Sequence, residues 1–217
     1  MRFSRNYVYL LPLLLAAAGC KNPADDKPKA TVSDSATGVT TAAETHGKGT
    51  VESLVIAANE SKVGFVGSKV TGSHEGSFSS VSGTIDLVDE KAEKSKVMVS
   101  IDTESVKTDN EKLTGHLKSP DFFDTAKFPK ATFTSTEIKP GGDKGATHTL
   151  TGDLDLHGVK KKISFPATIR VTPDSASTDA EFVINRKDFG IVYAGKADDL
   201  IRDEVVIKLS VKAPRKK

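Results

Sequence analysis

Apolar and polar residues alternate with a period of two through most of the chain between residues 51 and 213. Residues 163–171 carry an apolar side chain at every second position, and residues 97–101, 150–156 and 205–211 follow the same pattern. Successive side chains of a β-strand point to opposite faces of its sheet, so each run predicts a strand with one apolar and one polar face. Such strands are typical of antiparallel sheets that are wet on one side.

Turn-forming residues separate these runs, among them residues 140–142 (PGG) and 157–158 (HG). Shorter alternating segments lie at residues 54–58, 63–70, 83–88, 131–138 and 181–185. Eight or nine strands joined mostly by short turns predict an all-β antiparallel domain, either a barrel or a sandwich.

One helix interrupts the strand pattern. Thr108 and Glu111 have the spacing of a capping box, Leu113 begins an apolar face, and Pro120 ends the segment. A second short helix is expected over residues 196–201.

Four of the ten phenylalanines lie within twelve residues, at positions 122, 123, 128 and 133. Phe122 and Phe123 stand between Pro120 and Pro129, in a segment that cannot form one regular helix or strand. Large rings on irregular backbone must be covered by other groups. They either plug the end of a core or line the mouth of an apolar cavity.

The first residues predict a targeting segment rather than part of the fold. Residues 1–19 combine basic residues with an apolar run too short to span a bilayer, which is typical of a signal peptide. The run ends at Cys20, the single cysteine, in a sequence that resembles a bacterial lipobox. We therefore expect Cys20 to carry a lipid anchor that holds the chain at the cell envelope, facing the periplasm, with the outer membrane favoured over the inner. Residues 20–49 are polar and predict a disordered tether that places the domain about 30 Å from the anchor, and residues 214–217 predict a solvated basic tail.

Composition argues against two classes of function. The 31 basic and 29 acidic residues nearly balance, whereas a nucleic-acid partner would require a concentrated basic surface. The chain has no G-x-S-x-G or H-E-x-x-H motif, so we expect no enzymatic activity. His74, His116 and His157 lack the spacing of zinc ligands, so we expect no metal site.

Five motifs, in the same order along the chain, resemble those of the YceI-like family. The members of this family are periplasmic lipid-binding proteins with a lipocalin-like barrel. The five motifs are residues 103–110 (TESVKTDN), 116–133 (HLKSPDFFDTAKFPKATF), 152–159 (GDLDLHGV) with 163–166, 185–193 (NRKDFGIVY) and 203–207 (DEVVI). The resemblance implies that residues 50–213 form an antiparallel barrel of about eight strands. It also implies a bound long-chain lipid, either a polyisoprenoid or an isoprenoid quinone, with no other cofactor, and it leaves a homodimer open.

The candidate ligand contacts follow from this expectation together with the alternation. The expected lining residues are Phe65, Phe78, Ile85, Val97, Val99, Leu154, Leu156, Phe165, Phe189 and Tyr193. The expected cap consists of Leu117, Phe122, Phe123, Phe128 and Phe133. His116, Arg186 and Asp188 are candidates for contacts with a polar head group, although His116 can equally be a packing residue and the other two can instead fix the turn at Gly190.

One alternative stays open at this point. The same barrel with a filled core would be a structural or interaction module of the envelope. A closed barrel fills its interior with side chains by default, so the volume of the interior distinguishes the two readings.

Overall fold

The computed structural model describes residues 22–35 and 49–215. The predicted signal peptide, Cys20 and residues 216–217 lie outside this part of the chain. Its strands are β1 Thr31–Asp34, β2 Val51–Val55, β3 Lys62–Ser68, β4 Ser73–Phe78, β5 Val81–Val88, β6 Lys91–Asp102, β7 Val106–Thr108, β8 Lys130–Pro140, β9 His148–Leu156, β10 Val159–Val171, β11 Ser175–Asn185, β12 Gly195–Lys196, β13 Asp199–Leu200 and β14 Glu204–Pro214. The helix α1 spans Glu111–Lys118, and four short 3₁₀ turns are η1 Ala58–Glu60, η2 Thr103–Ser105, η3 Asp143–Gly145 and η4 Arg186–Phe189. Within this part of the chain, no helix is long and apolar enough to cross a membrane.

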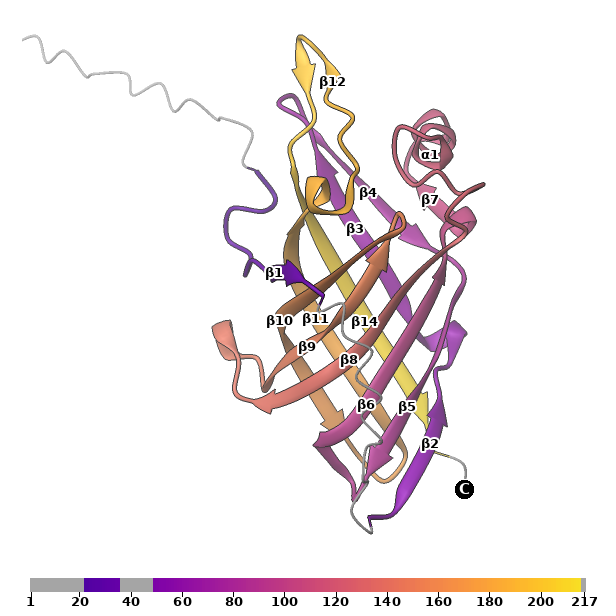
Figure 1. The fold of residues 1–217 in the computed structure, drawn as a ribbon, viewed down its shortest axis with the longest axis vertical. Coiled ribbons are helices and arrows are strands. Elements are labelled where there is room, and N and C mark those ends of the chain that lie inside the picture. The colour runs from indigo at the N-terminus through magenta and orange to yellow at the C-terminus, as the bar shows by residue number, and fades with distance from the viewer. Residues whose placement is uncertain (1–21, 36–48, 216–217) are drawn as a thin grey trace, which may run out of the picture.

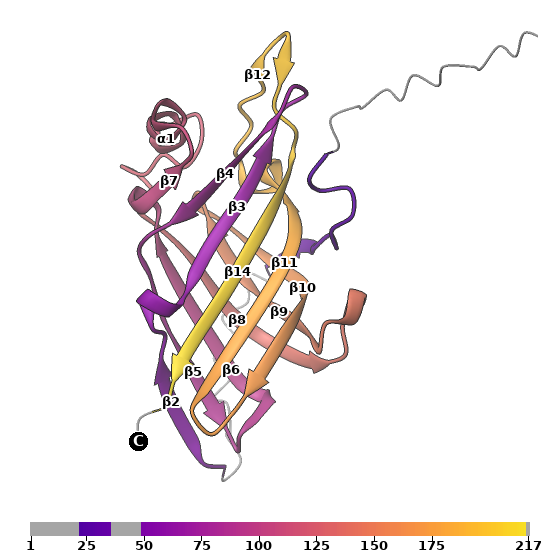
Figure 2. The same ribbon diagram turned by 180° about the vertical axis from the view of Figure 1, so that it is seen from behind.

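Twelve strands form one antiparallel sheet in the order β2-β5-β6-β8-β9-β10-β11-β14-β3-β4-β7, with β1 attached to β10. The sheet curls into an elongated half-barrel, and α1 and the β12–β13 hairpin lie at one end of its long axis (Figures 1 and 2). The Ala57 N–H donates to the Lys212 carbonyl at 2.8 Å, which joins the segment after β2 to β14. The expected all-β, lipocalin-like fold is confirmed, with more strands than the eight expected.

Strand register decides which side chains face the interior. Phe65 of β3 pairs with Ile207 of β14, which in turn pairs with Phe182 of β11. Because directly paired residues point to the same face of a sheet, these three side chains enter the interior together. Their sequence neighbours Val66, Val183 and Val206 point to the outer face.

The segment at residues 22–35 is not a disordered tether, so that expectation is wrong for these residues. β10 pairs with β11 only over residues 168–171, and β1 pairs with residues 161–164 of β10 where the two strands have separated. The Ala30 N–H donates to the Val183 carbonyl at 2.8 Å, and the Val183 N–H donates to the Pro28 carbonyl at 2.9 Å. The segment therefore fills a split in the barrel wall, where unpaired backbone groups would otherwise cost free energy.

Side-chain contacts hold the same segment in place. Ala24 is 1% exposed and packs on the outward-facing Val66, Val183 and Val206. The Lys27 ammonium lies 2.7 Å from the Glu181 carboxylate. Sequence reasoning missed the segment because its apolar residues are few and show no period.

Three smaller expectations also need correction. The N-cap of α1 is Asn110, whose side-chain oxygen accepts from the Leu113 N–H at 3.1 Å, so the capping box at Thr108 is wrong. Residues 196–201 form the β12–β13 hairpin instead of a helix. Arg215 is not simply solvated, because its guanidinium pairs with Glu52 at 2.7 Å and with Glu90 at 2.9 Å.

Replacing Ala24 with Asp is expected to release residues 22–35 from the barrel. An unpaired carboxylate among three valines costs about 1–3 kcal/mol, which is enough to detach a short segment. Hydrogen exchange should show faster exchange of the Ala30 and Val183 amides. Ser33→Asp adds the same charge at an exposed position of β1 and should leave these amides protected. Equal exchange in both variants would contradict the packing described here.

Candidate functional site

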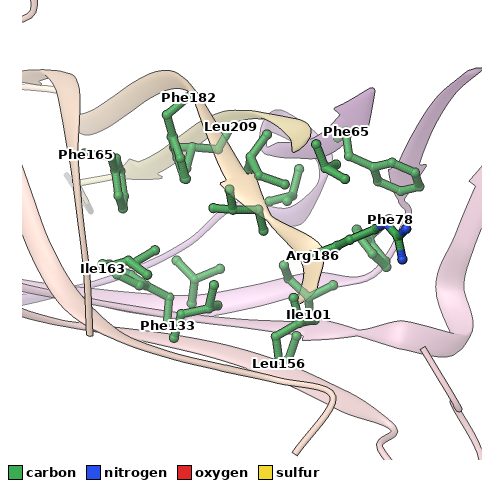
Figure 3. Close-up of a pocket in the computed structure, with 18 of the residues that line it drawn as sticks. Phe65, Phe78, Ile101, Phe133, Leu156, Ile163, Phe165, Phe182, Arg186 and Leu209 are labelled. Atoms are coloured by element: carbon green, nitrogen blue, oxygen red, sulfur yellow. The ribbon is translucent and has the colours of Figure 1, made fainter. Parts of the chain in front are cut away.

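An apolar cavity of about 210 Å³ lies inside the half-barrel (Figure 3). Inward-facing residues of β3, β6, β8, β9, β10, β11 and β14 form most of its wall. The polar side chains in the wall are Thr178, Arg186 and Arg202, and every other lining residue is apolar or glycine. The period-two alternation of the sequence produces this wall, because the same strands turn their polar residues outward.

Three phenylalanine rings form the floor of the cavity. Phe165 and Phe182 lie face to face with ring centroids 4.0 Å apart, and Phe133 lies 5.6 Å from Phe165. Beyond them lies a small void of about 10 Å³. Phe133 fits because Gly152 faces it, where a Cβ atom would lie 2.5 Å from the ring. The cavity is therefore closed at this end.

A second group of rings narrows the opposite end. Phe65, Phe78 and Phe123 contact one another with centroid separations of 5.5–6.2 Å. The Phe65 ring lies over Gly76, its partner on β4, where a Cβ atom would be only 2.2 Å away. Figure 3 shows Phe65 and Phe78 at the end of the cavity opposite Phe165 and Phe182.

Outside this narrow end lies a vestibule of about 330 Å³ between α1 and the β12–β13 hairpin. Phe65, Leu117, Phe122 and Ile201 line both the cavity and the vestibule, so the two spaces adjoin. The cavity wall has three polar side chains, whereas the vestibule wall has eight polar residues. They are Ser68, Lys69, His74, Asn110, His116, Tyr193, Lys196 and Asp199.

His116 is both packed and hydrogen-bonded in the vestibule wall. Its ring lies edge-on to Phe122 at 4.9 Å and to Tyr193 at 5.1 Å. Its Nε2 lies 2.8 Å from the Asp121 carboxylate. The residue therefore has the packing role that the sequence allowed, and it also stands where a head group could contact it.

Arg186 binds several chain segments at the mouth, which is the narrow end of the cavity next to the vestibule. It is 4% exposed, and its guanidinium donates to the carbonyls of Ile191 at 2.7 Å and Arg202 at 3.1 Å, and to the Asp203 carboxylate at 3.1 Å. Burial lowers the pKa of Arg186 from its usual value, while the charge of Asp203 opposes this shift. The side chain still keeps its charge, because arginine does not deprotonate in proteins.

The sequence comparison identifies the family of this domain. A family model described as YceI-like domain matches residues 54–213. The chain belongs to the YceI-like family. Protein YceI of Escherichia coli O157:H7 is 39% identical over 122 residues, a match that spans 54% of this chain and 62% of that relative's length.

Two solved structures show the same fold as this YceI-like chain. The Campylobacter jejuni YCEI protein is 28% identical, with a TM-score of 0.53 over 65% of this chain and 85% of that one. A polyisoprenoid binding domain from Saccharophagus degradans, implicated in plant cell wall breakdown, is 20% identical, with a TM-score of 0.60 over 77% of this chain and 100% of that one.

Most of the candidate residues of this YceI-like domain lie in the cavity wall. They are Phe65, Phe78, Val97, Val99, Leu117, Phe122, Phe123, Phe133, Leu154, Leu156, Phe165 and Arg186. Phe133 belongs to the floor and not to the cap. His116 and Tyr193 line the vestibule.

Four candidates lie elsewhere. Ile85 lines the small void beyond the floor, and Phe189 is fully buried in the core. Phe128 packs on His157 at 4.8 Å, away from the cavity. Asp188 is exposed and lines neither the cavity nor the vestibule, and Arg186 forms its ion pair with Asp203.

Sequence reasoning missed Phe182, Ile207, Leu209 and Arg202 as wall residues. Ile207 and Leu209 alternate correctly along β14 and could have been found from that signal. Phe182 stands in an unbroken apolar run with Val183 and Ile184, which hides the face to which it points. Within the described residues, no cluster of three or more His, Cys, Asp or Glu side chains could hold a metal ion.

Replacing Arg186 with Met is expected to lower the free energy of unfolding by about 2–5 kcal/mol, because buried carbonyls lose their donor. Urea unfolding measures this change. Asp188→Asn is the matched control and should change stability by less than about 0.5 kcal/mol. A comparable loss in the Asp188→Asn control would show that the effect is not specific to Arg186.

Proposed function

We propose that this protein binds a long-chain apolar ligand, a polyisoprenoid, an isoprenoid quinone or a similar amphiphile, inside its half-barrel and performs no catalysis on it. The observation that carries the proposal is the enclosed apolar cavity of about 210 Å³. An engineered apolar cavity of about 150 Å³ stays dry and binds benzene, so this one has room for a larger apolar group.

The free-energy cost of an empty cavity supports the proposal. At about 24 cal/mol per Å³, a void of about 210 Å³ costs about 5 kcal/mol, which is a large part of the stability of a typical domain. Each CH₂ group that moves from water into the cavity contributes about 0.8 kcal/mol. Binding of an apolar ligand therefore offsets the free-energy cost of the void.

The adjoining vestibule favours an amphiphile over a pure hydrocarbon. A tail in the cavity would end at the ring floor, and a polar head would meet the histidine and lysine side chains of the vestibule. The polyisoprenoid binding domain of Saccharophagus degradans shares the fold, which agrees with such a ligand. The alternative of an envelope module with a packed core is disfavoured, because the interior is not filled.

Native mass spectrometry of the full chain carrying Cys20→Ser, followed by organic extraction, tests the proposal. A discrete added mass that extracts as a prenyl chain or quinone is the expected result. Ile207→Trp should abolish the added mass, because the indole fills the cavity that Ile207 lines. Met98→Trp adds the same ring at an exposed position of β6 and should retain the ligand. An apo mass that stays unchanged after incubation with quinones, isoprenols and fatty acids would refute the proposal.

We also propose that a lipid on Cys20 holds the barrel close to the envelope membrane. Ala24 packs on the barrel, and four residue steps from Cys20 span at most about 14 Å. The docked segment runs from β1 toward the end that carries α1 and β12 (Figures 1 and 2). The mouth would then lie near the lipid surface, so a ligand could pass from the bilayer into the cavity over a short distance.

Cys20→Ser should move the protein from the membrane fraction to the soluble fraction of cells, because a thiol is required for acylation. Radiolabelled fatty acid should label the unsubstituted chain and not the variant. Membrane association that persists in the variant would contradict the anchor while leaving the ligand proposal intact.

A further inference from the structure

Arg186 and Arg202 lie close together at the mouth, and within the described part of the chain only the Arg186 guanidinium is hydrogen-bonded. Arg186 donates to three carbonyls and one carboxylate. Arg202 is half-buried, its Nε is fully buried, and no acceptor among the described residues lies within hydrogen-bond distance of that atom. Asp203, the nearest carboxylate in sequence, is bound by Arg186 and Lys187.

The backbone fixes Arg202 at the boundary between cavity and vestibule. Its N–H donates to the Ser68 carbonyl at 2.9 Å, and its own carbonyl accepts from the Arg186 Nε at 3.1 Å. The Arg202 side chain is part of the cavity wall, and the preceding Ile201 lines both spaces. The backbone of Arg202 is therefore held by two hydrogen bonds, neither of which uses its side chain.

The groups around Arg202 favour an anionic ligand group over a neutral one. A buried donor without an acceptor destabilises the protein, and a charged one does so more strongly. Of the charged vestibule residues, Lys69 is neutralised by Asp199, whereas Lys196 has no ion pair among the described residues. A positive charge thus remains at the inner side of the mouth, on Arg202, and at the outer side, on Lys196.

We propose that Arg202 binds the anionic head group of an amphiphile, a carboxylate or a phosphate, whose tail fills the cavity. This inference rests on the proposed function and gives the ligand its chemical class. Planar guanidinium groups suit both anions, since they can donate two parallel hydrogen bonds. After a rotation of the Arg202 side chain that exposes its buried Nε, the head group would supply the acceptor that this atom lacks.

Binding of matched pairs of ligands at pH 8 tests the inference on the full chain carrying Cys20→Ser. Hexadecanoate is compared with hexadecanol, and farnesyl phosphate with farnesol, by displacement of a fluorescent apolar probe. The unsubstituted Arg202 should bind at least one anion about tenfold more tightly than its alcohol. The pair that shows the preference identifies the head group as carboxylate or phosphate.

Arg202→Met and Arg202→Gln should remove this preference and leave binding of the alcohols unchanged, whereas Arg202→Lys should retain part of it. Arg170→Met removes an exposed arginine of β10 that pairs with Asp179, and should keep the full preference. Melting temperatures show whether each variant is folded. A preference that survives in folded Met and Gln variants, or its absence in the starting protein, overturns the inference while alcohol binding still supports the proposed function. Failure to bind any of the four ligands overturns the inference, and only a further failure to bind quinones overturns the proposed function as well.

Discussion

Backbone hydrogen bonding in a curled sheet is the constraint on which the rest of this structure depends. A sheet that encloses an apolar space must pair its N–H and C=O groups, because no water inside is available to pair with them. β10 and β11 separate after four paired positions, and such a split would expose two strand edges beside the cavity. Residues 28–34 close it with strand pairing on one side and two hydrogen bonds to Val183 on the other. The segment that precedes the family domain is thus part of the wall.

The mouth of the cavity depends on a buried polar side chain, Arg186, in an otherwise apolar region. The chain from η4 to β14 has little regular structure, so its carbonyls need donors from side chains. Arg186 supplies them from one buried guanidinium, which ties Ile191 and Arg202 to the same point. Buried charge is costly unless it is fully bonded, and here almost every donor is used. Arg186 thus joins separate parts of the rim through hydrogen bonds to one side chain.

The parts of the fold that the sequence predicts correctly are those in which one face is buried and the other wet. β10 and β14 follow this rule, and their inward residues were identifiable from alternation alone. The rule fails where both faces are covered. Val183 is apolar because Ala24 covers it from outside, so the run from Phe182 to Ile184 gives no face assignment. Phe128 was misplaced for a different reason, since contacts with His157 and Gly158 depend on tertiary packing that spacing does not encode.

The cavity and its mouth determine different properties of a ligand. An apolar void is non-directional, so its wall sets the size and shape of what enters and little else. The ring floor of Phe133, Phe165 and Phe182 limits how far a tail can reach, because only about 10 Å³ is free beyond it. Orientation must come from polar groups, and most of these lie in the vestibule wall or, as Arg186 and Arg202, at the mouth. A molecule with one apolar and one polar end is therefore the class that satisfies both halves of the site, with its tail inward and its head at the rim that Arg186 holds in place.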